Sequence, residues 1–87
     1  MKDIVVVTEA EYVEAYKLAL TFSDGVRAVI DFTKWIKDYP FFELLKDLDY
    51  FKNFSVDGWT VVWPNGADVG PETLHKIAIK SLESQPA

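Results

Sequence analysis

Four polar side chains are of the types that could do acid–base or ligand chemistry together: Asp31, Asn65, Asp68 and His75. His75 is the only histidine, and a general base or a metal ligand needs other polar groups close to it. Glu72 lies one helical turn earlier and is the only candidate that is close in sequence. If folding brings the four side chains together around a pocket, the chain is a small ligand-binding protein or an enzyme.

Each of these side chains also has a structural interpretation, which we favour. A histidine on an exposed helix face accounts for His75, and Asp31 is placed to cap or anchor a turn at Thr33. Asp24 and Asp57 belong to Asp-Gly pairs, which are typical of turns. The sequence has no cysteine, Gly-rich phosphate loop, serine elbow or zinc-ligand spacing. We therefore expect a non-catalytic protein without a metal or a cofactor.

Two aromatic segments are candidates for contact with a protein partner. The run from Trp63 to Asp68 sets a tryptophan beside a turn, with Asn65 near the start of the last predicted helix. Trp35 and Tyr39 belong to a dense aromatic group, and aromatic side chains often anchor interfaces. The candidate partner-binding residues are Trp35, Tyr39, Trp63, Asn65 and Asp68. Core packing is the alternative for Trp63, and at least one of Trp35 and Tyr39 is expected at the surface.

Composition limits the class of protein. The 87 residues are 49% hydrophobic and 15% aromatic, which predicts one folded α+β domain over residues 1–80 and a frayed tail over residues 81–87. The net charge of −5 and the scattered basic residues argue against direct binding of nucleic acid. No apolar run has the length of a signal peptide or a membrane span, so we expect a cytoplasmic protein without a membrane contact.

The first half of the chain is expected to begin the sheet. Residues 4–8 are β-branched and predict a strand, whereas the acidic residues 9–14 predict a loop or a helical turn. Apolar residues alternate over residues 16–22 and 26–32, which predicts a hairpin. A three-residue loop with a left-handed Gly25 keeps charges off the apolar face and pairs Phe22 with Val26 and Leu18 with Ile30.

A second hairpin and several helices complete the predicted fold. A two-residue type I′ turn at Asp57-Gly58 pairs Val56 with Trp59 and Phe54 with Val61. Thr33 is expected to cap a short helix over residues 34–37, and Pro40 to begin a second one. The residues expected to face the sheet are Phe41, Leu44, Leu45 and Leu48 in the second helix, and Leu74, Ile77 and Ala78 in a last helix that opens at Pro71. The fold class is α+β, a small antiparallel or mixed sheet of about five strands built from two hairpins, with short helices packed on it.

Several motifs, in this order along the chain, resemble one family. They are Phe22-Ser23-Asp24-Gly25, Asp31-Phe32, Phe42 with Leu45, Phe51, Trp63 to Val69, and Pro71-Glu72-Thr73-Leu74. The set resembles the bacterial family called domain of unknown function 2442, over roughly residues 4–75. The resemblance implies a compact α+β fold and no catalytic residues. Some members look fused to a helix-turn-helix module, for which about 12 residues after His75 leave no room, and others suggest a toxin–antitoxin pair.

We therefore predict an uncharacterised non-catalytic module that binds another protein or itself. The antitoxin-like half of a small two-protein system and a homo-oligomer are both forms of this hypothesis. If the first strand is an edge, residues 4–7 offer backbone groups to a partner strand. The alternatives are the ligand-binding protein or enzyme that uses Asp31, Asn65, Asp68 and His75, and an accessory domain associated with DNA.

Overall fold

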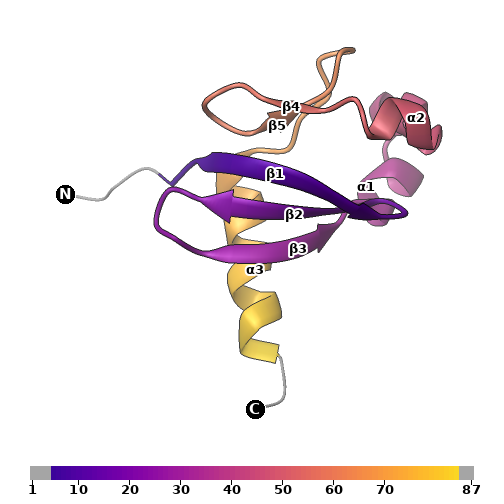
Figure 1. The fold of residues 1–87 in the computed structure, drawn as a ribbon. Helices are drawn as coiled ribbons and strands as arrows, with labels where there is room; N and C mark the ends of the chain where they lie inside the picture. Colours follow the sequence, from indigo (N-terminus) through magenta and orange to yellow (C-terminus); the bar gives the residue numbers. More distant parts are fainter. Residues whose placement is uncertain (1–4, 85–87) are drawn as a thin grey trace.

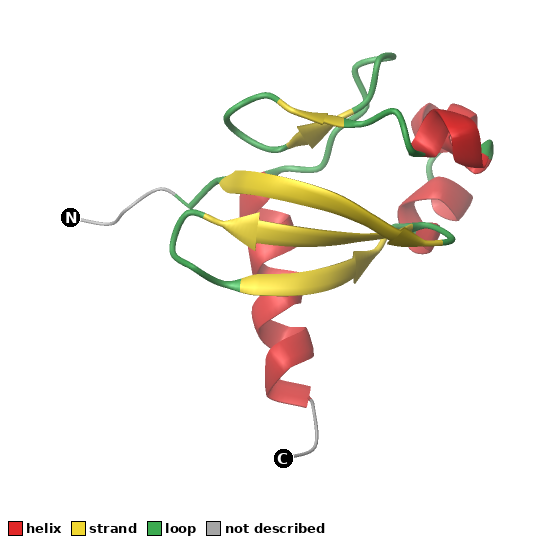
Figure 2. Ribbon diagram, in the orientation of Figure 1, coloured by secondary structure: helices red, strands yellow, loops and turns green. Residues whose placement is uncertain are grey.

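The computed structural model describes residues 5–84, without the side chains of residues 82–84, and it has an α+β fold. Figure 1 shows the elements, and Figure 2 shows how helices and strands are distributed. In chain order they are β1 (Val7–Glu14), β2 (Lys17–Phe22), β3 (Arg27–Asp31), α1 (Thr33–Asp38), the 3-10 helix η1 (Pro40–Lys46), α2 (Leu48–Phe51), β4 (Ser55–Val56), β5 (Val61–Val62) and α3 (Pro71–Ser84).

The strands form two antiparallel sheets instead of one. The larger sheet has the order β1-β2-β3, and the smaller one pairs β4 with β5. Helix α3 crosses one face of the larger sheet, and α1, η1 and α2 gather at one end of it (Figure 1). One hydrophobic cluster joins these parts, because inward residues such as Leu18 and Ile30 pack with Leu74 and Ala78 of α3.

The prediction for the first strand was wrong in its position. The strand covers Val7 to Glu14, so it includes the acidic segment expected to be a loop or a helical turn, while Ile4 lies outside the described residues. Register shifts between Val7 and Glu9 and between Tyr12 and Glu14 interrupt the alternation of inward and outward side chains along the strand. Because of such bulges, the sequence does not show the period of two that is typical of a strand.

The start of β1 is not open to a partner strand. The Val7 amide donates to the Trp59 carbonyl at 3.0 Å, and on the other side Ser23 N donates to the Val6 carbonyl at 2.8 Å. The Val6 amide also donates to the Ser23 hydroxyl. Both sides of this segment are therefore engaged within the chain, which contradicts the idea that it pairs with another protein.

The hairpin of β2 and β3 confirms the predicted register. Leu18 pairs with Ile30 and Leu20 with Ala28, and the Phe22 amide donates to the Val26 carbonyl at 2.8 Å. Gly25 has a φ of 91°, which is the left-handed conformation that the three-residue loop requires. The Asp24 side chain accepts from the Val26 amide and closes the loop.

The second hairpin differs from its prediction by two residues. Val56 pairs with Val61 instead of Trp59, and the chain turns over Gly58 and Trp59. Asp57 does not have the positive φ of a type I′ turn; its carboxylate accepts instead from the amides of Trp59 and Thr60. Thr60 is buried, and its hydroxyl donates to the Val69 carbonyl at 2.7 Å. These side-chain bonds favour an exposed Trp59 over the register that hydrophobicity suggested.

The segment after Pro40 is a 3-10 helix, which changes the face that it buries. A 3-10 helix places residues i and i+3 on the same side, so Phe42 and Leu45 form its buried side. Phe41 and Leu44 form the opposite, exposed side. The predicted buried face of Phe41, Leu44, Leu45 and Leu48 is therefore wrong except at Leu45.

Helix α3 agrees in part with its prediction. Leu74 and Ala78 are buried, but Ile77 is 36% exposed because it lies beside the covered stripe. The helix continues through Ser84 and so enters the segment expected to be a frayed tail, while residues 85–87 lie outside the described part of the chain.

Candidate functional site

The fold gives separate partners to the residues proposed for ligand chemistry. Asp31 binds Thr33, Asn65 binds the segment beside it and η1, and His75 binds Asp24. Within residues 5–84, no hydrogen bond joins two of the four candidates, and no group of three or more His, Cys, Asp or Glu side chains could hold a metal ion. The described hydrogen bonds therefore do not join the four side chains into one site.

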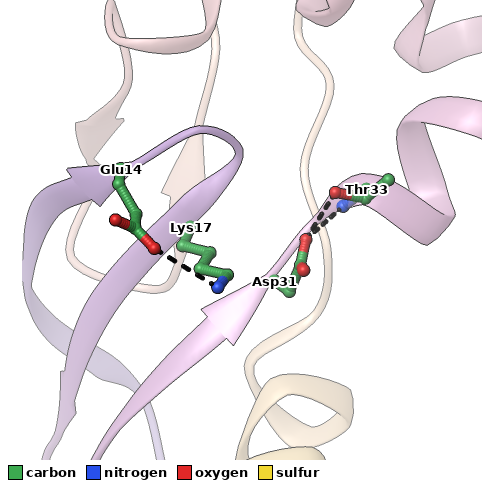
Figure 3. Close-up of polar contacts among 4 residues, drawn as sticks. All are labelled: Glu14, Lys17, Asp31 and Thr33. Atoms are coloured by element: carbon green, nitrogen blue, oxygen red, sulfur yellow. Dashed lines mark hydrogen bonds and ion pairs between the residues drawn. The ribbon is translucent and has the colours of Figure 1, made fainter.

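Asp31 anchors the entry to α1, as expected for its structural role. Its Oδ1 accepts from the Thr33 amide at 2.9 Å and from the Thr33 hydroxyl at 2.6 Å (Figure 3). Thr33 was expected to be the cap itself, but it is the donor, and the N-cap position belongs to Phe32. Burial raises the pKa of Asp31, but the bonds from Thr33 and the nearby Lys17 ammonium outweigh it and lower the pKa overall.

His75 joins α3 to the loop between β2 and β3. Its Nε2 lies 2.8 Å from Asp24 Oδ2, and its ring meets the Phe22 ring edge-on at a centroid distance of 5.1 Å. Its side chain is only 22% exposed, so the expectation of a histidine on an exposed helix face was wrong. The amide of Val26 and, less strongly, His75 hold the pKa of Asp24 below its usual value. This pair fixes the end of the sheet against α3.

Stability is expected to fall in acid through three turn aspartates. The pKa values of Asp24, Asp31 and Asp57 lie below the ordinary 3.8, that of Asp57 because the Thr60 and Trp59 amides donate to it. Each carboxyl binds its proton less well in the folded chain, so its contribution is complete above about pH 4 and is lost as the pH falls through the folded pKa. The urea midpoint should therefore decrease below about pH 4, and Asp57→Asn should reduce that decrease. An unchanged pH profile in this variant would contradict the assignment.

The Trp63 to Asp68 segment has a structural role. Trp63 is 2% exposed and its Nε1 donates to the Phe51 carbonyl at 2.7 Å, so its ring offers no surface to a partner. This corrects its place among the partner-binding candidates. The Asn65 Oδ1 accepts from the Ala67 amide at 3.0 Å, and Asp68 is exposed beside Val62 in an isolated bridge.

Asn65 also connects the two aromatic segments identified in the sequence. Its Nδ2 donates to the Phe41 carbonyl at 3.4 Å, so the turn lies against the start of η1. Trp35 is half-buried with its ring 5.2 Å from that of Phe32, whereas Tyr39 is 54% exposed. The expectation that at least one of Trp35 and Tyr39 lies at the surface is confirmed.

The candidate functional site is the exposed side of η1, beside Asn65. We call Phe41 and Leu44 the η1 stripe; their side chains are 60% and 56% exposed. Because Phe42 and Leu45 hold the other side of η1 in the core, the stripe is presented on a fixed support. Sequence patterns missed it, because a period of 3.6 residues put both side chains in the core. A period of three after Pro40 was the signal that could have found it.

The described residues define the class as a small α+β protein, with an antiparallel sheet covered by helices. The chain belongs to the family of proteins of unknown function DUF2442, whose model matches residues 7–80. This confirms the resemblance seen in its motifs. Neither the curated proteins nor the solved structures gave a match to the chain. Among residues 5–84, no helix is long and apolar enough to cross a membrane.

Proposed function

We propose that this chain is a non-catalytic module that binds another protein through the η1 stripe. The observation that carries the proposal is the exposure of two large apolar side chains, Phe41 and Leu44, on the same side of one short helix. A phenylalanine and a leucine at the centre of an interface are each worth about 1.5–3 kcal/mol when they are fully buried. The buried opposite side of η1 keeps the stripe in place, so little ordering is required on binding.

Polar groups around the stripe complete the features of an interface. Asn65 lies against the Phe41 carbonyl, and Glu43 and Lys46 form an exposed pair at 4.0 Å on the same helix. Apolar anchors inside a polar rim are the usual anatomy of a protein interface. The chain carries a net charge of −5, so a basic partner would be attracted to it over a longer range than a neutral one.

The partner in the most specific form of this proposal is a small basic protein that the module neutralises, as an antitoxin does. The acidic charge of the chain, −5, is complementary to such a basic partner. A partner that arrests growth when expressed alone, and does not when expressed with this chain, would support the antitoxin-like role. A partner without any effect on growth would remove that role and leave protein binding.

Loss of the stripe is expected to weaken capture of the partner. The F41S/L44S chain should lose at least about tenfold in affinity, because two interface anchors are removed while neither side chain supports the core. The measurement is capture from a nuclease-treated lysate of the native host, with the protein identified by mass spectrometry and its affinity then measured with purified components.

A matched variant controls for the loss of exposed apolar surface in general. Val13 on β1 is 45% exposed and lies outside the stripe, so V13S should capture the partner as well as the wild type does. Equal capture by F41S/L44S and the wild type would overturn the proposed site. Failure of both serine variants would show that capture depends on exposed apolar surface in general, which would also overturn the proposed site.

A further inference from the structure

Strand β3 lies at an edge of the larger sheet and presents a definite set of backbone groups there. At the two ends of the hairpin, the Phe22 amide donates to the Val26 carbonyl and the Phe32 amide to the Tyr16 carbonyl, both at 2.8 Å. In an antiparallel pair, successive residues turn their backbone groups alternately toward and away from the neighbouring strand. The residues of β3 whose N–H and C=O groups point away from β2 are therefore Arg27, Val29 and Asp31.

The same three residues have a symmetric pattern of side chains. Arg27 and Asp31 carry opposite charges at the two ends of β3, and Val29 lies midway between them. All three side chains are exposed on the face of the sheet that does not contribute to the core. Among the described residues, Arg27 has no ion-pair partner. A strand with this pattern is complementary to a second copy of itself that runs in the opposite direction.

We propose that two copies of this chain associate through β3, antiparallel about a two-fold axis at Val29, and form one continuous six-stranded sheet. Val29 then faces Val29 of the second copy, and Arg27 faces Asp31 of the second copy at each end. Because the backbone N–H and C=O groups of these three residues point away from β2 in each copy, the pairing forms about six backbone hydrogen bonds. The surface is distinct from the η1 stripe, so the inference does not depend on the proposed function.

Charge selects this register over its neighbours. A shift of two residues keeps the backbone bonds possible, but it sets Arg27 or Asp31 opposite Val29 and loses both ion pairs. A shift of one residue sets backbone groups that point away from β2 in one copy opposite residues whose groups are already bonded to β2 in the other, so the hydrogen bonds between the copies cannot form. In the proposed register, Asp31 Oδ1 stays bound to Thr33 (Figure 3). No described hydrogen bond occupies Oδ2, so the arginine of the second copy would join the Lys17 ammonium beside this carboxylate.

The surface beside β3 adds area to the contact. Asp31 also lines a hollow of about 280 Å³ whose other lining residues are Lys34, Trp35, Tyr39 and Ile77. Helix α3 passes behind the sheet and extends beyond β3, on the side where a second sheet would continue (Figure 1). A five-residue strand spans only about 17 Å, which is short for the roughly 1,200–2,000 Å² of a stable interface. The hollow beside Asp31 and helix α3 are therefore needed as contact surface.

Sedimentation equilibrium of the full chain tests the assembly. The wild type should have twice the 9.9 kDa mass of one chain at high concentration. R27D and D31R should each dimerise about tenfold more weakly or worse, because each sets like charges opposite one another twice. An equal mixture of the two variants should regain the dimer, since the aspartates of the first variant would then face the arginines of the second at both ends of the strand pair. A wild type that remains monomeric at every concentration overturns the proposal.

Two measurements separate this dimer from any other dimer and from misfolding. The amides of Arg27, Val29 and Asp31 should exchange slowly with solvent in the dimer, so rapid exchange of these amides in a dimeric sample overturns the proposed pairing. K52D makes the same change of charge beside Tyr12, and it should leave the dimer intact. Far-ultraviolet circular dichroism checks that each variant folds; if D31R does not, the R27D result and the amide exchange decide. R27D should still capture the η1-stripe partner.

Discussion

Replacement of Trp63 by alanine is expected to remove about 3–5 kcal/mol of unfolding free energy. The ring is buried, stacks on Phe51 at a centroid distance of 5.6 Å and meets Phe32 edge-on at 5.5 Å. An 87-residue chain has a total stability of about 4–13 kcal/mol, so this single change removes most of it near the lower end of that range. Urea denaturation followed by circular dichroism measures the loss.

A conservative variant separates the contribution of the Trp63 ring to stability from the contribution of its hydrogen bond. Trp63→Phe keeps an aromatic ring in the core but leaves the buried Phe51 carbonyl without the Nε1 donor that lies 2.7 Å away. We expect this variant to lose about 1–3 kcal/mol for the unsatisfied carbonyl, plus a smaller amount for the cavity. A loss of less than about 1 kcal/mol in Trp63→Ala would show that the ring is not the centre of the core.

The first hairpin could be predicted because its local signals agree. Alternation along Leu18, Leu20 and Phe22, the glycine at position 25 and the need to keep charges off the apolar face all require one register. The second hairpin has the same Asp-Gly signal but a different register. There the Asp57 carboxylate binds two amides and the Thr60 hydroxyl reaches Val69, and neither bond has a signature in the hydrophobic pattern.

Contacts between distant residues account for most of what the sequence did not predict. His75 and Asp24 are 51 positions apart, and Val7 reaches Trp59 across the space between the two sheets. Such pairs depend on how the elements pack, and the local pattern of apolar residues carries no information about that packing. The candidate site follows the same rule, because Asn65 lies against Phe41 only when the turn folds onto η1.

The second large effect concerns the 3-10 helix, where replacement of only one of two adjacent phenylalanines should destabilise the chain. Phe42→Ala is expected to lose about 3–5 kcal/mol of unfolding free energy, since Phe42 is 7% exposed and packs in the core cluster. Phe41→Ala makes the same chemical change at an exposed position and should stay within about 0.5 kcal/mol of the wild type.

The α-helical spacing read from the sequence buries Phe41 and therefore predicts a large loss for Phe41→Ala as well. Urea midpoints of the two alanine variants decide between the two arrangements of η1. If Phe41→Ala is the more damaging change, the helix is turned the other way and the η1 stripe is not at the surface. If Phe42→Ala is the more damaging, Phe42 holds the core side of η1 and Phe41 can be replaced without unfolding the chain. A loss of partner capture in the F41S/L44S chain is then expected to come from the stripe itself.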